Sequence, residues 1–389
     1  MILQTIVLAM YIILSILFSL GLVYGYLMFR YGQGWKSLPA FKPVKPISGH
    51  TKVTVIIPAR DEEANLPPLL QALKAQTYPA HLFEVIVIDD FSTDATADVV
   101  RNFPASNVQL LQLSQHLSAE QRLNSYKKKA IEIAVERATG HIIMTTDADC
   151  VMGPEWITRM VQFYETYQPK FIAAPVSFYQ EHNFFKVLQS LDFMTMQGIT
   201  GALAALKSGT MCNGANLAYE RKVFYEVGGF KGIDNIASGD DMLLMFKIYR
   251  AYPAGVLYMK SEEAIVRTLP VDTFKAFMHQ RIRWSSKADK YDDKRLTSVL
   301  ALVYFWNAGM LLAGIAALFL PAWRIWFVGL LIYKILVEFY FMVPVARFFD
   351  KTALLSRFIP GQFFHIPYIV VAGWLGKFGS YQWKGRKVK

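Results

Sequence analysis

The chain has 389 residues, enough for one large domain or two small ones, and 53% of them are hydrophobic. Its mean hydropathy of +0.26 is high for a purely soluble protein. The formal net charge is +11, but the sequence contains no nucleic-acid-binding motif, and its basic residues cluster beside apolar segments. Attraction to anionic lipid headgroups explains this charge more simply, so we expect a membrane partner and no nucleic acid.

Four segments are apolar enough to form membrane helices. Residues 1–29 are almost free of charge, and so are most of Val299–Leu320, Trp323–Ala346 and Phe358–Leu375. Each approaches the roughly 20 apolar residues that a membrane-crossing helix needs. The first lacks a basic start and a small-residue cleavage site, which favours a retained anchor over a cleaved signal. We expect an anchor at 1–29, a linker at 30–50, a soluble domain at 51–297 and a membrane region of two to three spans at 298–389.

The basic residues beside the anchor predict its orientation. They are Arg30, Lys36, Lys42 and Lys45. By the positive-inside rule they place the soluble domain in the cytoplasm, at the cell membrane, where Cys150 and Cys212 are expected to be reduced thiols. If all three later segments span, the basic tail Lys384–Lys389 ends outside, against the same rule. Pro360 and Pro367 make a re-entrant or interfacial last segment an alternative, and the side of the tail stays open.

Strands and helices alternate along the soluble domain. A continuous β-branched run predicts a buried strand at Val53–Ala59, and Phe83–Asp90 predicts a second one. Val108–Leu113 and the segment from Ile142 to Asp149 are expected to form a third and a fourth strand. Helical spacing predicts helices at Asn65–Thr77, Ser92–Phe103 and Tyr126–Ala138. Asn65 is expected to cap the first of these helices, and Ser92 or Thr93 to start the second. The alternation is typical of an α/β domain with a parallel sheet, which binds ligands at the carboxyl ends of its strands.

Three of these strands end in acidic segments: Ala59–Glu63, Asp89–Asp94 and Asp147–Asp149. Asp147 and Asp149 repel each other, and a divalent cation would offset that repulsion. On an extended chain both would point to one side, where Mg²⁺ or Mn²⁺ could bind them together with a nucleotide diphosphate. A turn with two solvent-facing aspartates is the alternative. Neither a Walker loop nor Gly-x-Gly-x-x-Gly follows a strand, so a glycine-rich phosphate loop is not expected.

Six segments in order resemble one known family. They are VIIPARDEEANL, VIVIDDFSTDAT, TTDADC, GANLAYERKVFYEVGGF, SGDDMLL and QRIRW. Together they are similar to family 2 of the inverting, nucleotide-sugar-dependent glycosyltransferases, over roughly Val53 to Ser286. The later apolar segments match the membrane-bound branch of that family. The resemblance implies a GT-A fold, a Rossmann-like sheet that binds a nucleotide sugar and carries a metal-binding Asp-x-Asp motif.

The resemblance assigns nucleotide contacts to seven residues: Pro58, Arg60, Glu62, Asp89, Asp90, Lys127 and Asp147. Asp90 matches the aspartate that contacts uracil, and Asp147 and Asp149 match the metal motif. Lys128 and Lys129 are alternatives to Lys127 in register, and a solvated basic helix face is the other reading of this triplet. The chain departs from the family at Asp61, where an asparagine is frequent.

The second half of the domain matches the acceptor side of the family. Asn213–Phe230 is expected to form a loop, a strand and a turn, in which Gly214 and Asn216 approach the acceptor sugar; an ordinary glycine turn is the alternative. Asp240 and Asp241 fall at a predicted helix start, which favours carboxylates through the helix dipole. Capping would account for one of them. The resemblance makes Asp241 the general base, with Asp240 beside it.

QRIRW matches the Gln-x-x-Arg-Trp signature of the family. Gln280, Arg283 and Trp284 would share one helix face, with Arg283 near the diphosphate and Trp284 against an acceptor sugar. The surrounding segment, residues 273–286, also has the amphipathic look of an interfacial helix. The signature is frequent in cellulose- and hyaluronan-synthase-like enzymes and also occurs in single-sugar lipid glycosyltransferases.

These observations predict a membrane-bound inverting glycosyltransferase that uses a UDP-sugar, Mg²⁺ or Mn²⁺ and a lipid-linked or glycan acceptor, with partner membrane proteins possible. A processive polysaccharide synthase that exports its product is the alternative enzyme, and three to four spans are few to enclose a sugar chain. A non-catalytic membrane scaffold that binds nucleotide sugar is more remote, because no expected carboxylate is missing. A basic membrane-surface protein would leave the acidic strand ends unexplained.

Overall fold

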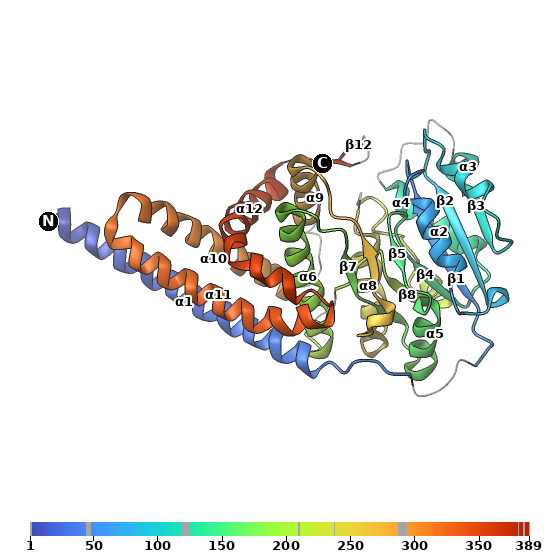
Figure 1. The fold of residues 1–389 in the computed structure, drawn as a ribbon, viewed down its shortest axis with the longest axis horizontal. Coiled ribbons are helices and arrows are strands. Elements are labelled where there is room, and N and C mark those ends of the chain that lie inside the picture. The colour runs from blue at the N-terminus through green and yellow to red at the C-terminus, as the bar shows by residue number, and fades with distance from the viewer. Residues whose placement is uncertain are drawn as a thin grey trace. The chain divides into compact units, whose positions relative to one another are not determined.

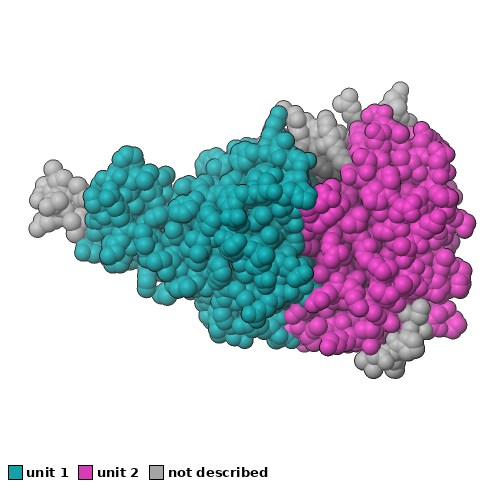
Figure 2. Space-filling model, viewed as in Figure 1, with its two compact units in different colours: residues 1–37, 181–202, 271–389 teal, residues 38–180, 203–270 magenta. Residues whose placement is uncertain are grey.

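The computed structural model describes residues 2–43, 48–117, 125–208, 211–236, 238–286, 294–379, 381–383 and 386–388. The chain forms two compact units, coloured separately in Figure 2. Unit 1 contains Met1–Ser37, Glu181–Ala202 and Val271–Lys389, and unit 2 contains Leu38–Gln180 and Leu203–Pro270. The expectations for Lys45 and for tail residues 384, 385 and 389 fall outside the described residues.

Unit 2 is built on a seven-stranded sheet in the order β3-β2-β1-β4-β8-β6-β9 (Figure 1). Its strands are β1 (Val53–Ala59), β2 (Phe83–Asp89), β3 (Val108–Gln112), β4 (Ile142–Thr145), β6 (Phe171–Ala173), β8 (Leu217–Glu220) and β9 (Val256–Tyr258). The first four strands of the order are parallel, as predicted, whereas β8 runs antiparallel to both β4 and β6. The predicted α/β class is confirmed.

Register brings the acidic strand ends to one edge of the sheet. Ala59 at the end of β1 lies opposite Asp89 at the end of β2. On the other side of β1, Ile56 lies opposite Thr145, the last residue of β4. The three strands therefore end close together, as expected for parallel neighbours.

The helices of unit 2 are α2 (Leu66–Lys74), α3 (Thr96–Arg101), α4 (Tyr126–Arg137), α5 (Trp156–Tyr167), α7 (Arg221–Glu226) and α8 (Asp240–Ala251). Helix α4 packs against β1 and β2, and α8 packs against β9. A smaller sheet joins β5 (Val151–Met152), β10 (Val266–Thr268) and β7 (Val176–Phe178).

One local prediction in unit 2 was confirmed and two were wrong. Asn65 is the N-cap residue of α2, as predicted, although its side-chain amide donates to Glu62 Oε2 at 2.6 Å and its side chain makes no capping hydrogen bond. Helix α3 begins at Thr96, after Ala95, because Ser92 and Thr93 take part in hydrogen bonds of the preceding loop. The expected strand and turn after Asn213 also contain helix α7.

Unit 1 contains the apolar helices. Its elements are α1 (Ile2–Ser37), α6 (Phe184–Ala205, most of which belongs here), α9 (Phe274–Ser285), α10 (Lys294–Phe319), α11 (Pro321–Phe348), α12 (Phe358–Phe378) and the hairpin β11 (Tyr381–Trp383) and β12 (Arg386–Val388). Among the described residues, four segments are long and apolar enough to cross a membrane: Met10–Ser37, Lys294–Phe319, Pro321–Phe348 and Thr352–Phe378. Exposed side chains such as Leu318, Phe319 and Ile325 suit a lipid environment. These features indicate a membrane protein.

Close packing and buried polar contacts join the apolar helices. Helix α1 approaches α11 so closely that a Cβ on Gly25 would clash with the Tyr333 hydroxyl. Tyr24 of α1 donates to Glu338 of α11 at 2.5 Å, and Glu338 also pairs with the fully buried Lys334. Gln362 of α12 donates to the same carboxylate at 2.8 Å. Lys334 and Glu338 therefore neutralise each other, as burial in an apolar environment demands.

The compact units do not coincide with the segment boundaries expected from sequence. Helix α1 continues to Ser37, so the expected linker at 30–50 begins as helix. Residues Glu181–Ala202 and everything from Val271 onward group with the apolar helices. Helix α6 was not predicted, because Lys186 and Asp192 interrupt its apolar run; Asp192 is paired with Arg281 of α9 at 2.9 Å.

Candidate functional site

The Asp-x-Asp motif lies in a turn that directly follows β4. Strand pairing with β8 ends at Thr145, and the chain then turns through residues 147–150, with the Cys150 amide donating to the Asp147 carbonyl at 3.2 Å. The expected extended geometry at Asp147 and Asp149 is therefore wrong. Both carboxylates remain partly exposed at the carboxyl edge of the sheet.

Lys127 of α4 connects this turn to the start of α8. Its Nζ lies 2.8 Å from Asp147 Oδ1 and 3.3 Å from Asp240 Oδ2. Burial by itself lowers the pKa of Lys127, but Asp147, Asp240 and Asp241 outweigh it and raise that pKa above its ordinary value. The side chain is thus a fixed cation between the metal motif and the acidic helix start.

Asp241 is oriented by main-chain hydrogen bonds. Its Oδ2 accepts from the Gly214 amide at 3.0 Å, and its Oδ1 accepts from the Met242 amide at 2.7 Å. Thr145, the last residue of β4, donates to the Gly214 carbonyl at 2.8 Å. Gly214 therefore couples the strand that precedes the metal motif to the carboxylate of Asp241. Each carboxylate oxygen keeps further acceptor capacity for a substrate hydroxyl.

The three neighbouring lysines of α4 have different surroundings. Lys127 meets the carboxylates of Asp147 and Asp240, as described above. Lys128 is buried, and its Nζ donates to main-chain carbonyls. Lys129 pairs with Glu132 at 2.8 Å on the half-exposed helix surface. Of the three, Lys127 therefore contacts the acidic side chains at the sheet edge, and a simple solvated face does not describe the triplet.

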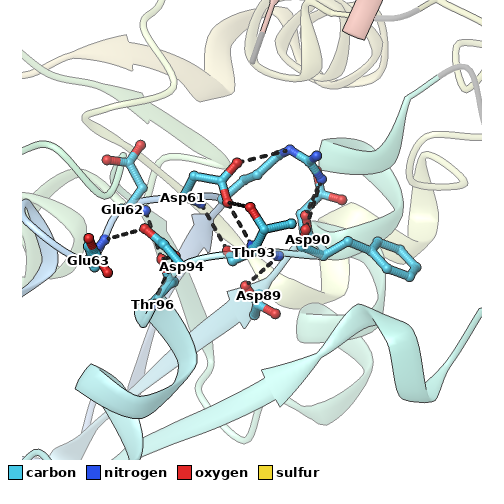
Figure 3. A network of polar contacts seen from close by, with 11 residues as sticks. Asp61, Glu62, Glu63, Asp89, Asp90, Thr93, Asp94 and Thr96 are labelled. Atoms are coloured by element: carbon cyan, nitrogen blue, oxygen red, sulfur yellow. Dashed lines mark hydrogen bonds and ion pairs between the residues drawn. The ribbon is translucent and has the colours of Figure 1, made fainter. Parts of the chain in front are cut away.

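The loops after β1 and β2 are tied together by the polar network of Figure 3. Arg60 donates to the carbonyls of Asp90 and Phe91 at 2.7 and 3.2 Å. Asp61, which adopts the left-handed conformation, accepts from the amide of Thr93 at 2.8 Å. Asparagine and aspartate tolerate this conformation best among residues with a side chain, which accounts for an acidic residue where the family often has asparagine.

Two further contacts complete the loop network. The Glu62 amide donates to the Thr96 hydroxyl at 2.8 Å, and the Glu63 amide donates to Asp94 at 3.1 Å. Burial tends to raise the pKa of Asp94, but hydrogen bonds from Thr96 and the Glu63 amide lower it below the ordinary value. The network explains how two loops at one sheet edge keep a fixed shape.

The expected nucleotide residues all lie on this edge of unit 2. Pro58 is the partly exposed penultimate residue of β1. Asp89 and Asp90 are 4% and 3% exposed, and Asp89 accepts from the Ser92 amide at 3.2 Å. Asp90 begins the adjoining loop, its amide held by the Ala59 carbonyl at 2.8 Å.

Asn216 does not fit the expected acceptor contact. It is fully buried, and its amide donates to the carbonyls of Pro175 and Ala264 at 2.7 and 2.8 Å. Its Oδ1 accepts from the Trp156 indole at 2.9 Å. The side chain therefore fastens β8 to its neighbours within the fold, while Gly214 remains beside the carboxylates.

The Gln-x-x-Arg-Trp residues lie on α9 in unit 1, and the predicted helix over this segment is confirmed. Gln280 Oε1 is buried and has no hydrogen-bond partner among the described residues. Trp284 packs under the guanidinium of Arg281, 4.3 Å from its ring centroid. Contacts of Gln280, Arg283 and Trp284 with diphosphate or acceptor stay a prediction.

A mixed sheet with an acidic carboxyl edge defines the class of protein as GT-A-like. A solved structure is consistent with this class: mannosyltransferase PcManGT from Pyrobaculum calidifontis, in complex with GDP-Man and Mn²⁺. The likeness has a TM-score of 0.56 at 19% sequence identity and covers 87% of this chain and 97% of that chain. At this identity it is the fold that is shared.

Sequence comparison gives the family. The model described as Glycosyl transferase family 2 matches residues 54–228, and that of Glycosyl transferase family group 2 matches residues 142–356, more than half of the chain. The chain belongs to the family 2 glycosyltransferases, and the resemblance stated above is confirmed.

Two curated relatives illustrate the range of the family. Glycosyltransferase AglE of Haloferax volcanii is 26% identical over 190 residues, which is 49% of this chain and 59% of AglE. Undecaprenyl-phosphate 4-deoxy-4-formamido-L-arabinose transferase of Aeromonas hydrophila is 34% identical over 111 residues, 28% of this chain and 32% of that enzyme. The chain spans less than two thirds of the length of either relative.

Proposed function

We propose that the chain is a membrane-anchored, inverting glycosyltransferase that transfers a sugar from a UDP-sugar to a lipid-linked or glycan acceptor, with Asp241 as general base. The observation that carries the proposal is the double ion pair of Lys127, at 2.8 Å to Asp147 and 3.3 Å to Asp240. It links the carboxylate of the metal motif to the helix start that carries Asp241. Donor binding and base catalysis would thus occur side by side.

The reaction follows from these positions. The acceptor hydroxyl attacks the anomeric carbon from the face opposite the leaving nucleotide, and its proton passes to the carboxylate of Asp241. The new carbon–oxygen bond forms as the bond to the diphosphate oxygen breaks, and UDP leaves with that electron pair. A single displacement inverts the anomeric configuration. The fixed charge of Lys127 favours the negative charge that develops on the diphosphate.

A divalent cation fits the oxygen donors at the turn after β4. Mg²⁺ and Mn²⁺ prefer hard oxygen ligands and are bound through one or two carboxylates together with water and substrate phosphates. Asp147 and Asp149 are two partly exposed carboxylates of this kind. Among the described residues there is no group of three or more His, Cys, Asp or Glu side chains arranged for a metal. When bound, the cation would supply charge stabilisation of the leaving diphosphate.

Different observations support the location of the acceptor and the identity of the donor nucleotide. Four apolar segments and the undecaprenyl-phosphate relatives favour an acceptor held in the membrane. The basic residues after the first apolar segment favour a cytoplasmic unit 2. The match of Asp90 to the family's uracil-contacting aspartate favours UDP, whereas PcManGT was solved with GDP-Man. Both nucleotides therefore belong in the test.

The test is turnover by the purified, detergent-solubilised protein against a panel of UDP- and GDP-sugars, with Mn²⁺ or Mg²⁺ and a lipid-linked sugar acceptor that carries free hydroxyl groups. We expect metal-dependent release of UDP from one donor and a product of inverted configuration. No turnover of any donor in the panel, together with no binding of UDP or GDP, would overturn the proposal. Product length distinguishes single transfer from the processive alternative, which the Gln-x-x-Arg-Trp signature keeps open.

A further inference from the structure

The segment before α8 is rich in glycine and places the two aspartates. It runs from Gly228 to Gly239, and four of its glycines have positive φ: Gly228 (71°), Gly229 (48°), Gly232 (85°) and Gly239 (80°). Glycine reaches this region without steric penalty and loses the most conformational freedom on ordering. The path of the segment therefore depends on contacts that other elements make with it.

Two lysines from two helices supply such contacts. Lys128 of α4 donates to the carbonyls of Ile233, Ile236 and Ser238 at 2.6, 2.6 and 3.3 Å. Lys247 of α8 donates to the carbonyls of Gly228, Gly229 and Lys231 at 3.4, 2.6 and 2.8 Å. Lys247 thus holds the beginning of the segment, and Lys128 holds the end that leads into Asp240 and Asp241.

Helix α8 begins directly after the end of the segment that Lys128 holds. Its N-cap is Gly239, which has no side chain with which to cap the helix. The carbonyl of Ser238, immediately before Gly239, is one of the three that Lys128 holds. An ammonium group has three N–H donors, so the three carbonyls use all of them. Lys128 is 1% exposed, which leaves water little access to replace these bonds.

We infer that Lys128 is a positioning residue for transfer: by holding the end of the 228–239 segment, its ammonium sets the place of Asp240 and Asp241. The inference rests on the proposed function of Asp241. Lys128 acts through main-chain carbonyls, whereas Lys127, its neighbour in sequence, contacts the carboxylates themselves. A misplacement of about 1 Å at a catalytic group costs roughly 100-fold in rate, so loss of this support should reduce transfer by a factor of that order.

The protonation state of Lys128 gives the inference a distinctive signature. Burial lowers the pKa of Lys128 to about 8, and three carboxylates, Asp240, Asp241 and Asp234, oppose that shift. As pH rises through about 8, the ammonium becomes an amine with two N–H donors, and one carbonyl loses its partner. Transfer should therefore be supported below this pH and should decline above it.

The experiment compares Lys128→Met, Lys128→Arg and Lys247→Met in the full-length protein. Transfer and UDP affinity are measured from pH 6 to 10, and amide hydrogen exchange is followed over residues 233–245. We expect Lys128→Met to transfer roughly 100-fold more slowly while binding UDP with wild-type affinity, and to exchange faster at the start of α8. Lys128→Arg, which stays charged, should transfer without the decline near pH 8.

Lys247→Met is the matched control, since it removes three similar lysine–carbonyl bonds at the other end of the segment. A purely structural role would make the two Met variants equally slow, and would overturn the inference, as would wild-type transfer by Lys128→Met. If Lys128→Met fails to fold, the pH profile of transfer by the wild-type protein decides instead. The absence of a decline near pH 8 would then overturn the inference. If the wild-type protein transfers nothing, the proposed function fails. Unchanged exchange at the start of α8 in Lys128→Met would separately refute the positioning role.

Discussion

Replacing Lys127 by Met should destabilise unit 2 and do so in a metal-dependent way. The side chains of Lys127, Asp240 and Asp147 are 23%, 13% and 39% exposed, so the exposure of the two ion pairs is intermediate between that of buried pairs and that of surface pairs. Breaking a buried pair costs about 3–5 kcal/mol, whereas an exposed pair contributes about 0–1 kcal/mol. We therefore expect a loss of about 1–3 kcal/mol in the free energy of unfolding. In a domain of this size each 1 kcal/mol lowers Tm by roughly 2–4 °C.

The assay is thermal unfolding in detergent, with and without Mn²⁺ and UDP. Without metal, Lys127→Met should melt about 2–12 °C below wild type, because Asp147 and Asp240 lose their shared cation. Mn²⁺ should narrow the gap, since a cation at Asp147 and Asp149 relieves the same repulsion. The control is Lys129→Met, whose partner Glu132 lies on the helix surface, and it should shift Tm little. Equal Tm values for Lys127→Met and wild type, or a gap that Mn²⁺ leaves unchanged, would refute the reasoning.

Three other substitutions separate folding from function. Asn216→Ala should lower the free energy of unfolding by roughly 3 kcal/mol or more, because the Trp156 indole and two carbonyls lose their partners. The folded fraction should keep its affinity for UDP. Weaker UDP binding at unchanged stability would contradict this prediction. Gly214→Ala should fold normally, since its Cβ would lie 3.6 Å or more from neighbouring atoms. It should lose transfer, because the methyl group faces the carboxylates. Unimpaired transfer would show that the substrate does not occupy the space beside Gly214. Asp149→Ala should weaken Mn²⁺-dependent UDP binding about tenfold or more in calorimetric titrations, and an unaltered affinity would remove it from the metal site.

The sequence predicts the sheet well where burial is continuous. Strand β1 matches its predicted bounds, and β2 ends one residue earlier than predicted, because β-branched runs buried on both faces leave few alternatives. Strand β3, which is only partly buried, also ends one residue earlier than predicted. The helix start at Asp240 is likewise as expected. Helix α6 escaped prediction because its charged residues find partners far away in sequence, as Asp192 does with Arg281. Such pairings are not visible in a local pattern.

The site was predicted as a set of residues but not as an arrangement. Motif matching cannot reveal that Lys127 bridges Asp147 and Asp240, because these residues meet only through the tertiary fold. It also placed Asn216 at the acceptor, although its amide completes long-range bonds inside the fold. A signal for Lys128 did exist. It stands three residues before Ile131 and seven before Val135, on the apolar face of α4, where a lysine needs a buried partner.

The most direct test of the account concerns the carboxylate of Asp241. The measurement is UDP release and acceptor glycosylation by wild type and Asp241→Asn, beside the affinity of each for UDP and Mn²⁺. Asparagine keeps the shape of the side chain but cannot accept the acceptor proton, so transfer should fall by roughly 100- to 10,000-fold while nucleotide affinity stays near that of wild type. Transfer by Asp241→Asn at the wild-type rate would contradict the account.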